Sequence, residues 1–377
     1  YAANIHQLGN HHIHQFTYPM LPRYPGIIDL HDSNIHHARA YSHLGHKNLN
    51  DYLEELTWCH GELAEKAGKA LAHGYHNAVL HDLSPMLKLI CQGARSVIVH
   101  NQFAHDQVLD YLDDDRVFQV PLPFLDAFLP DGKVTREQLD IASDELVVSA
   151  FGFVTPGKGV DSILAAFKLF HRQFPRSRFV FVGSFLDDDY RDHVQQLVAD
   201  SPEIHVTGYV NEDEWMQWLA VSDICVALRY PTQGESSGAL VRIMGAGKPV
   251  IVPDFKQYKA LPPDAVVRIP LYPSEPFALL TALRELVENP DEATAMGQKA
   301  ARFIEQNQNA DKWIKQYVRA IEQSIALPEP VPLGSSCDLR QVRVTPIEET
   351  VGLCLSNWGD FAEHDLVINP VVQAIME

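Results

Sequence analysis

Short apolar runs alternate with helix-like segments through the middle of the chain, and this alternation restricts the fold more than any other feature. The run LVVSAFGFV at 146–154 is continuously apolar and rich in β-formers, as a strand buried on both faces requires. The segment that follows has Val160, Ile163 and Phe167 at helical spacing. The same order of strand and helix continues to about residue 310. It predicts a Rossmann-like domain, with a parallel sheet and helices on both faces.

The first 135 residues carry a less complete version of this pattern. The strand, turn and helix that open a Rossmann half are missing from it. We therefore expect an α/β protein with an incomplete N-terminal Rossmann-like domain at 1–135, a C-terminal one at 136–326, and a linker with a helical tail at 327–377. A proline-bearing stretch at 120–133 is the expected link. In the first domain we expect strands at 26–30, 77–82, 96–100 and 117–120, and helices at 51–74 and 84–94.

Composition narrows the class of protein. The chain has 377 residues, 46% of them hydrophobic, and a net charge of -19. The charge disfavours nucleic acid and anionic lipid as partners. The five cysteines form no CxxC pair, and no apolar run reaches the roughly 18 residues of a membrane span. We expect a cytoplasmic protein, at most peripheral at the inner membrane, and a segment before Tyr1, because the chain does not begin with Met.

A glycine-rich loop, TPGKGVDSI at 155–163, joins a predicted strand to a helix. Gly157 permits a tight turn, and Lys158 stands beside a helix N-terminus, whose free N–H groups attract anions. An ordinary strand-to-helix turn with a solvated lysine explains the loop equally well.

A second loop lies at the start of the stretch 229–254 and places Glu235 before small residues at a helix start. The backbone N–H groups of these small residues suit a diphosphate, whereas a carboxylate suits the hydroxyls of a sugar. A simple helix cap is the alternative role for Glu235. Because both loops follow strands of one parallel sheet, Lys158, Arg229 and Glu235 are expected to converge on one ligand. The small residues are Ser236, Ser237, Gly238 and Ala239.

Nine of the 19 histidines fall in the first 50 residues. No metal is expected, since neither HExxH nor a Cys-His pattern occurs. His31 ends the strand at 26–30, where a neutral imidazole can donate to a substrate hydroxyl. His100 and Asn101 end another strand in the same way, and Asn10 is expected near the donor at the end of the first strand.

Five pieces of the chain together resemble the retaining, family-four nucleotide-sugar glycosyltransferases, which have two Rossmann-like domains facing across a cleft (the GT-B fold). The resemblance extends over nearly the whole chain and points to a bacterial subgroup with a GE-S-SG motif. It implies a hexosyltransferase that moves a sugar from a nucleotide-diphosphate sugar to a glycan, lipid-linked or small-molecule acceptor. It also implies retention of the anomeric configuration and no metal or other cofactor. The pieces are FGFVTPGKGVDSILAAF, FVFVG, VTGYV, SDICVALRYPTQGESSGALVRIMGAGKPVIV and HQLGNHHIHQFTYPMLPRYPGIIDLHD.

The resemblance also implies roles for single residues. Lys158 would contact phosphate, and the amides around Ser237 and Gly238 would hold the diphosphate. Glu235 matches the first glutamate of the family's E-x7-E motif, which addresses the donor sugar. His31 is similar to the first-domain histidine that faces the transferred sugar.

Three departures from the family pattern affect this interpretation. Ile243 stands where the second glutamate holds the ribose, Phe153 replaces the usual arginine, and the N-terminal turn is missing. Arg229 is then expected to take over part of the anion role. The loop with Gly208 and Tyr209 is expected to meet the base. Two rival functions stay open: a catalytically silent nucleotide-sugar-binding module or partner subunit, and a GT-B enzyme of different chemistry, such as an epimerase or phosphorylase.

Overall fold

The computed structural model describes residues 3–21, 23–45, 47–72, 81, 83–125, 136–271 and 274–328. The chain forms two compact units that interleave along the sequence, where contiguous domains were expected. The first unit takes the chain up to Pro121, the short loop Pro231–Ser236 and the chain from Ile314 onward. The second takes Leu122–Tyr230 and Ser237–Trp313. The expected helical tail, from residue 329, and most of the expected link lie outside the described residues.

Four parallel strands form the sheet of the first unit, in the order β1-β2-β3-β4. Three of them, β2 to β4, coincide with strands that the sequence predicts. The strand expected at 77–82 lies outside the described residues except for His81, which is helical. The strands are Ile5–Leu8, Gly26–Leu30, Ala94–Val99 and Val117–Gln119.

The single helix expected at 51–74 is wrong, because the structure has two helices there. Gly61 stands between α2 and α3 with φ +82°, a conformation that favours glycine, and its N–H donates to the Thr57 carbonyl at 2.7 Å. The hydrophobic spacing continues across this break, so the sequence pattern alone conceals it. The helices of the first unit before the loop are α1 (His36–Leu44), α2 (Leu49–His60), α3 (Glu62–Ala72), α5 (Lys88–Gly93) and α6 (Gln102–Leu109).

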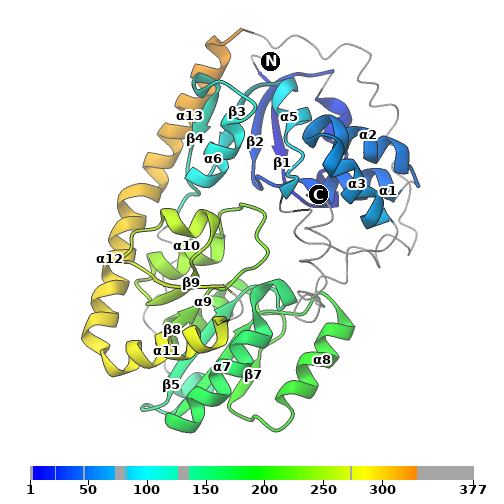
Figure 1. Cartoon of the computed structure of the whole chain (residues 1–377). Coiled ribbons are helices and arrows are strands. Elements are labelled where there is room, and N and C mark those ends of the chain that lie inside the picture. Colours follow the sequence, from blue (N-terminus) through cyan, green and yellow to red (C-terminus); the bar gives the residue numbers. More distant parts are fainter. Residues whose placement is uncertain are drawn as a thin grey trace. The chain divides into compact units, whose positions relative to one another are not determined.

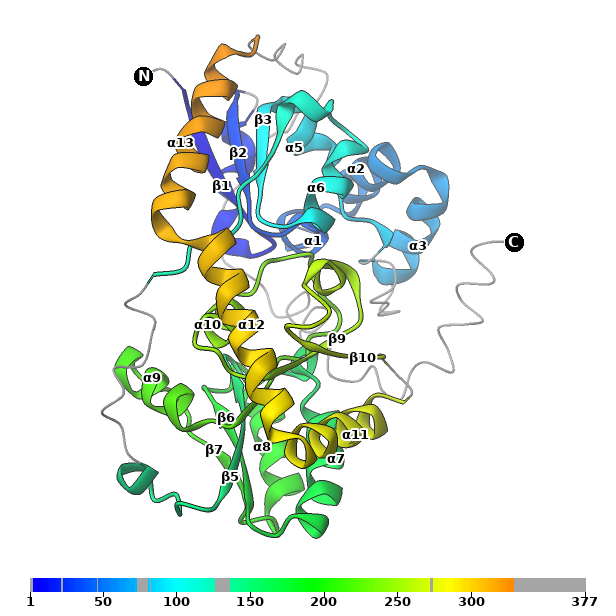
Figure 2. The ribbon, with the colours of Figure 1, turned by 90° about the vertical axis from the view of Figure 1, so that its left-hand side faces the viewer.

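Helix α13 (Ala310–Ala326) covers one face of the first sheet, and Figure 2 shows it running beside β1 and β2. The Tyr317 hydroxyl donates to Asp29 Oδ2 of β2 at 2.6 Å, and the hydroxyls of Ser324 and Ser96 are 2.6 Å apart. The opposite face of the sheet packs into an apolar core with α1, α2 and α5. The last described helix of the chain therefore covers a sheet whose first strand begins at residue 5.

Six parallel strands form the sheet of the second unit, in the order β10-β9-β8-β5-β6-β7. Figure 1 labels four of them, β5, β7, β8 and β9. The chain runs outward from the central strand β5 through β6 and β7, returns to β8 on the other side of β5, and continues to β9 and β10. The order of strands therefore reverses between β5 and β8, and ligands of such sheets bind beyond the carboxyl ends of the strands at this point. The strands are Leu146–Phe151, Ser177–Val182, Ile204–Val206, Ile224–Val226, Val250–Pro253 and Val267–Ile269.

Successive strand residues of the second sheet enter two different apolar cores. Val148 and Phe179 pack on one face, whereas Val147 and Val180 pack on the other. Burial of both faces explains why the strands are continuous apolar runs. None of the described helices combines the length and the hydrophobicity that crossing a bilayer requires. The helices of this unit are α7 (Val160–Gln173), α8 (Asp188–Val198), α9 (Glu212–Val221), α10 (Gly238–Gly245), α11 (Glu275–Glu288) and α12 (Pro290–Gln308).

Candidate functional site

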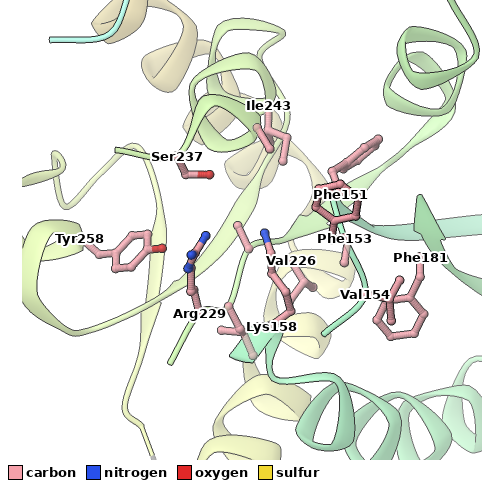
Figure 3. Close-up of a pocket in the computed structure, with 15 residues that line it drawn as sticks. Phe151, Phe153, Val154, Lys158, Phe181, Val226, Arg229, Ser237, Ile243 and Tyr258 are labelled. Atoms are coloured by element: carbon pink, nitrogen blue, oxygen red, sulfur yellow. The ribbon is translucent and has the colours of Figure 1, made fainter. Parts of the chain in front are cut away.

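A pocket lies at the β5–β8 switch point of the second unit (Figure 3). Its walls come from the end of β5 and the turn after it, the end of β8, and α10. It encloses about 480 Å³, part of which is open to solvent. This position is typical of a small-molecule site in an α/β sheet.

One side of the pocket is polar and positively charged. Lys158, Arg229, Ser237 and Tyr258 contribute to its lining, and Figure 3 shows their polar ends directed toward a common space. No carboxylate occurs among the residues that line the pocket, all of which belong to the described part of the chain. Two cationic side chains in one lining make this side of the pocket suitable for an anion, in a chain whose net charge is -19.

The glycine-rich turn brings Lys158 into this pocket. Gly152 ends β5 with φ +100°, and a Cβ on it would lie 3.4 Å from Lys158 Nζ. Gly159, with φ +67°, then turns the chain into α7. The Tyr230 N–H donates to the Gly157 carbonyl at 2.9 Å, so this turn is tied to the loop that follows β8 and carries Arg229.

Helix α10 opens its N-terminus at the same pocket. The Ser237 hydroxyl caps the helix by accepting from the Leu240 N–H at 3.3 Å, and a Cβ on Gly238 would meet no atom within 4 Å. The alternative that Glu235 caps this helix is therefore wrong. Glu235 Oε2 instead accepts from the Thr232 hydroxyl and from the Gln233 N–H, each at 2.8 Å, and so folds the loop before the helix.

The other side of the pocket is apolar. Phe151, Phe153 and Phe181 lie opposite Arg229, and Ile243 adds an aliphatic wall from α10 (Figure 3). Phe153 is 55% exposed, so its ring is accessible from solvent. The pocket therefore offers a cationic half and an apolar, partly aromatic half. The sequence analysis missed Phe181 and Tyr258, whose positions depend on the packing of β6 and of the turn after β9.

The loop with Glu235 and Ser236 belongs to the first unit, although the chain on both sides of it belongs to the second. Asn10, after β1, donates to Gln233 Oε1 at 2.8 Å. Asn101, after β3, donates to the Gly234 carbonyl at 2.9 Å and to the Ser236 hydroxyl at 3.1 Å. The carboxyl ends of the first sheet thus hold the loop of Glu235 in place.

His31 lies at this edge of the first sheet within a group of polar side chains. Its ring centroid is 5.3 Å from that of His100 and 6.3 Å from that of His14. His100 Nε2 lies 3.1 Å from Asp29 Oδ1. Burial lowers the pKa of His31, and the nearby imidazoles lower it further against the opposing effect of Asp29. Burial also acts to lower the pKa of His100, but Asp29 outweighs it and raises that pKa above its ordinary value.

Of the other predicted residues, most lie away from the pocket lining. Gly208 takes φ +74° in the turn after β7, and Tyr209 is 83% exposed, but neither lines the pocket. Ala239 does line it, whereas Gly157 and Gly238 do not. Among the residues that the structure describes, no cluster of three His, Cys, Asp or Glu side chains could hold a metal ion.

The fold and the pocket define an α/β protein of two Rossmann-like units with a ligand site at the switch point of the second. Residues 145–289, which carry this site, match the sequence model of the family described as "Glycosyl transferases group 1". The chain is 22% identical over 215 residues to the alpha-monoglucosyldiacylglycerol synthase of Acholeplasma laidlawii, a match that covers 55% of this chain and 50% of that protein. It is 24% identical over 170 residues to the uncharacterized glycosyltransferase MJ1069 of Methanocaldococcus jannaschii, covering 45% and 43%. The chain therefore spans about half the length of these relatives.

Solved structures show the same fold over most of the chain. Sucrose-phosphate synthase of Thermosynechococcus elongatus superposes with a TM-score of 0.60 at 17% identity, covering 85% of this chain and 74% of that one. Anabaena Alr3699/HepE in complex with UDP and glucose gives a TM-score of 0.59 at 15% identity, covering 84% and 78%. The chain has the GT-B fold of glycosyltransferases.

Proposed function

We propose that the protein is a glycosyltransferase that binds the diphosphate of a nucleotide sugar in the pocket of the second unit. The observation that carries the proposal is that Lys158 and Arg229 line one pocket at the switch point of the second sheet. The open N-terminus of α10 adds backbone N–H groups and a favourable dipole. The match of residues 145–289 to group 1 glycosyl transferases supports the same ligand class, as does the UDP and glucose held by the HepE structure.

In this proposal the cations act on the leaving group. Breaking the bond between sugar and diphosphate places negative charge on the phosphate oxygens. Lys158, Arg229 and the α10 amides would stabilise this charge in place, which is the form of catalysis that preorganised donors provide. Since two fixed cations already face the diphosphate, we propose that the reaction needs no bound metal.

We propose that Glu235 and His31 contact sugar hydroxyls. A carboxylate such as Glu235 accepts hydrogen bonds from sugar hydroxyls, and His31 has a ring nitrogen that can pair with a further hydroxyl. We propose a hexose as the transferred group, a glycan, lipid-linked or small-molecule acceptor, and retention of the anomeric configuration. The anomeric signal of the product in proton NMR decides between retention and inversion.

The ligand class is tested by a thermal-shift titration with UDP, GDP, dTDP and ADP. A ligand present at about 100 times its dissociation constant adds about 2.7 kcal/mol of stability. At least one of the four should raise the melting temperature of the wild-type protein. Lys158→Ala should lower the affinity for that nucleotide by about 10- to 100-fold, because hydrogen bonds to charged groups contribute about 1.5–3 kcal/mol.

Lys299→Ala is the matched control. Lys299 lies on α12 in the same unit, pairs with Asp264 at 3.1 Å, and is 46% exposed outside the pocket. The proposal fails if no nucleoside diphosphate stabilises the protein, or if the two lysine variants bind alike.

A further inference from the structure

We propose that Gln7 and Asp29 fix the tautomer of His31, so that the neutral imidazole keeps its proton on Nε2 and presents Nδ1 as a hydrogen-bond acceptor. The tautomer of His31 decides which kind of ligand group its ring can bind. Only the identity of that ligand rests on the proposed function, because the tautomer follows from contacts within the first unit.

The first step is the orientation of the Gln7 amide. Gln7 of β1 and Asp29 of β2 are direct partners in the register of the parallel ladder. Gln7 Nε2 donates to Asp29 Oδ2 at 2.9 Å. A carboxylate only accepts hydrogen bonds, so Gln7 must turn its NH₂ group, not its carbonyl, toward Asp29.

Asp29 itself is held in the ionised form. It is 4% exposed near the end of β2, and burial acts to raise its pKa. Contacts with His100, Tyr317 and Gln7 outweigh burial and lower the pKa below its ordinary value. The Tyr317 hydroxyl, from α13, donates to the same oxygen as Gln7.

The Gln7 amide in turn determines which nitrogen of His31 carries a proton. With its NH₂ group on Asp29, Gln7 directs its carbonyl oxygen at His31 Nε2, 2.5 Å away. An amide oxygen only accepts, so Nε2 must carry the proton of this bond. In a neutral imidazole the other nitrogen then holds the lone pair. No other hydrogen bond to the His31 ring occurs among the residues that the structure describes.

The charge state of His31 decides whether that lone pair is available. The charged or titratable groups that face the ring are Asp29 on its own strand, His100 after β3, and His14 after β1. Burial and the two imidazoles lower the pKa of His31, while Asp29 acts against them. The net direction favours the neutral ring at neutral pH.

The chemistry of the ligand group follows from this tautomer. A group that meets Nδ1 must donate a proton, as a hydroxyl or an amine does, and an ionised phosphate oxygen does not fit. Under the proposed function, His31 therefore accepts from a hydroxyl of the sugar or of the acceptor, which is the reverse of the donor role expected from the sequence. Gln7 and Asp29 are positioning residues, because they act through His31.

The tautomer is measured by long-range proton–nitrogen NMR on protein labelled with nitrogen-15 in histidine, at pH 7.5. His31→Gln identifies the His31 signals. The expected wild-type spectrum has a protonated Nε2 and an unprotonated Nδ1. A protonated Nδ1 or a doubly protonated ring would overturn the inference, and this measurement needs neither a nucleotide nor activity.

The cause of the tautomer is tested with Gln7→Met, which keeps the length of the side chain but removes the amide oxygen. The expected result is a mixture of the two His31 tautomers in place of one. Gln102→Met is the control, because Gln102 also donates to a carboxylate, Asp106 Oδ1 at 2.7 Å, and is exposed. An unchanged His31 spectrum in Gln7→Met, in protein whose other histidine signals remain in place, contradicts the role of Gln7.

Discussion

The two units share a plan of parallel strands flanked by helices, yet they bury different side chains. The first unit buries Asp29, His36, Arg39 and His100. The cores on both faces of the second sheet are aliphatic and aromatic, and the polar groups buried in that unit are mainly serines. The stability of the first unit should therefore depend on buried ion pairs and on the protonation states of buried groups. The stability of the second should depend mainly on the apolar area removed from water.

The same contrast holds at the carboxyl edges of the two sheets. The edge of the second sheet presents Lys158 and Arg229 beside an apolar wall, which suits an anion with a flat ring. The edge of the first presents His31, whose imidazole suits a hydroxyl, with His100 and Asp29 buried behind it. The same plan of fold thus places different side chains at its two edges.

The largest effect is expected from Arg39→Met. Arg39 is fully buried and donates to both oxygens of Glu55, and its guanidinium lies 4.5 Å from the centre of the Tyr18 ring. Its charge helps to hold the pKa of Glu55 at about 2 against burial. Removal leaves a buried carboxylate without its main partner, so the first unit should lose about 3–5 kcal/mol in urea unfolding.

The matching change in the second unit is Arg176→Met. Arg176 pairs with Asp144, and both side chains are mostly exposed. Exposed pairs contribute little, so no measurable loss is expected. Equal losses in the two variants would contradict the contrast between the interiors.

Mild acid should weaken the first unit selectively. Burial, helped by Lys88, lowers the pKa of His60 to about 4, and burial holds those of His36 and His37 well below the ordinary value. Between pH 6.5 and 4 the unfolded chain therefore binds protons that the folded chain does not, and stability falls as pH falls. Hydrogen exchange, corrected for its intrinsic pH dependence, should show α1 and α2 losing protection in this window before the second sheet does.

His60→Gln isolates one of these groups. His60 Nε2 accepts from the Met86 N–H at 3.0 Å, and a glutamine oxygen can replace that acceptor without titrating. The variant should show a shallower loss of stability with acid than the wild type. An unchanged slope of stability against pH would show that His60 does not contribute to the loss of stability in acid.

A smaller effect is expected from Phe153→Ala. If the exposed ring of Phe153 stacks on the base, the variant should lose about 1–3 kcal/mol of binding free energy for a nucleoside diphosphate. This is the usual contribution of one aromatic stack. Inorganic pyrophosphate should bind the variant and the wild type equally in calorimetry. Phe277→Ala, at a ring that is 68% exposed on α11 and outside the pocket, is the control. Equal weakening of both ligands would place Phe153 near the phosphates instead.

The smallest effect is expected from metal removal. In the proposed function two cations face the diphosphate, so sugar transfer by chelator-treated protein should match that of untreated protein. A loss of activity that Mg²⁺ or Mn²⁺ restores would show that Lys158 and Arg229 do not suffice.

The sequence predicts the sheets well, because buried parallel strands are written as continuous apolar runs such as 146–154. It also places Lys158 and Arg229 after strands of one sheet, and the structure brings both into one pocket. It misses the break at Gly61, where hydrophobic spacing continues through a turn of the chain. It cannot show that Gln7 and Asp29 become partners, since the register of two strands depends on the whole packed sheet.

The interleaved first unit has a consequence for how the protein is made. Asp29 and Tyr317 are hydrogen-bonded but 288 residues apart in the chain. A ribosome that adds about 5–20 residues per second produces Tyr317 roughly 15–60 s after Asp29. During that time the face of the first sheet that α13 covers waits for its helix, whereas all the strands of the second sheet are made within one stretch, residues 146–269. The unit whose synthesis begins first therefore cannot cover its sheet until nearly all of the described chain has been made.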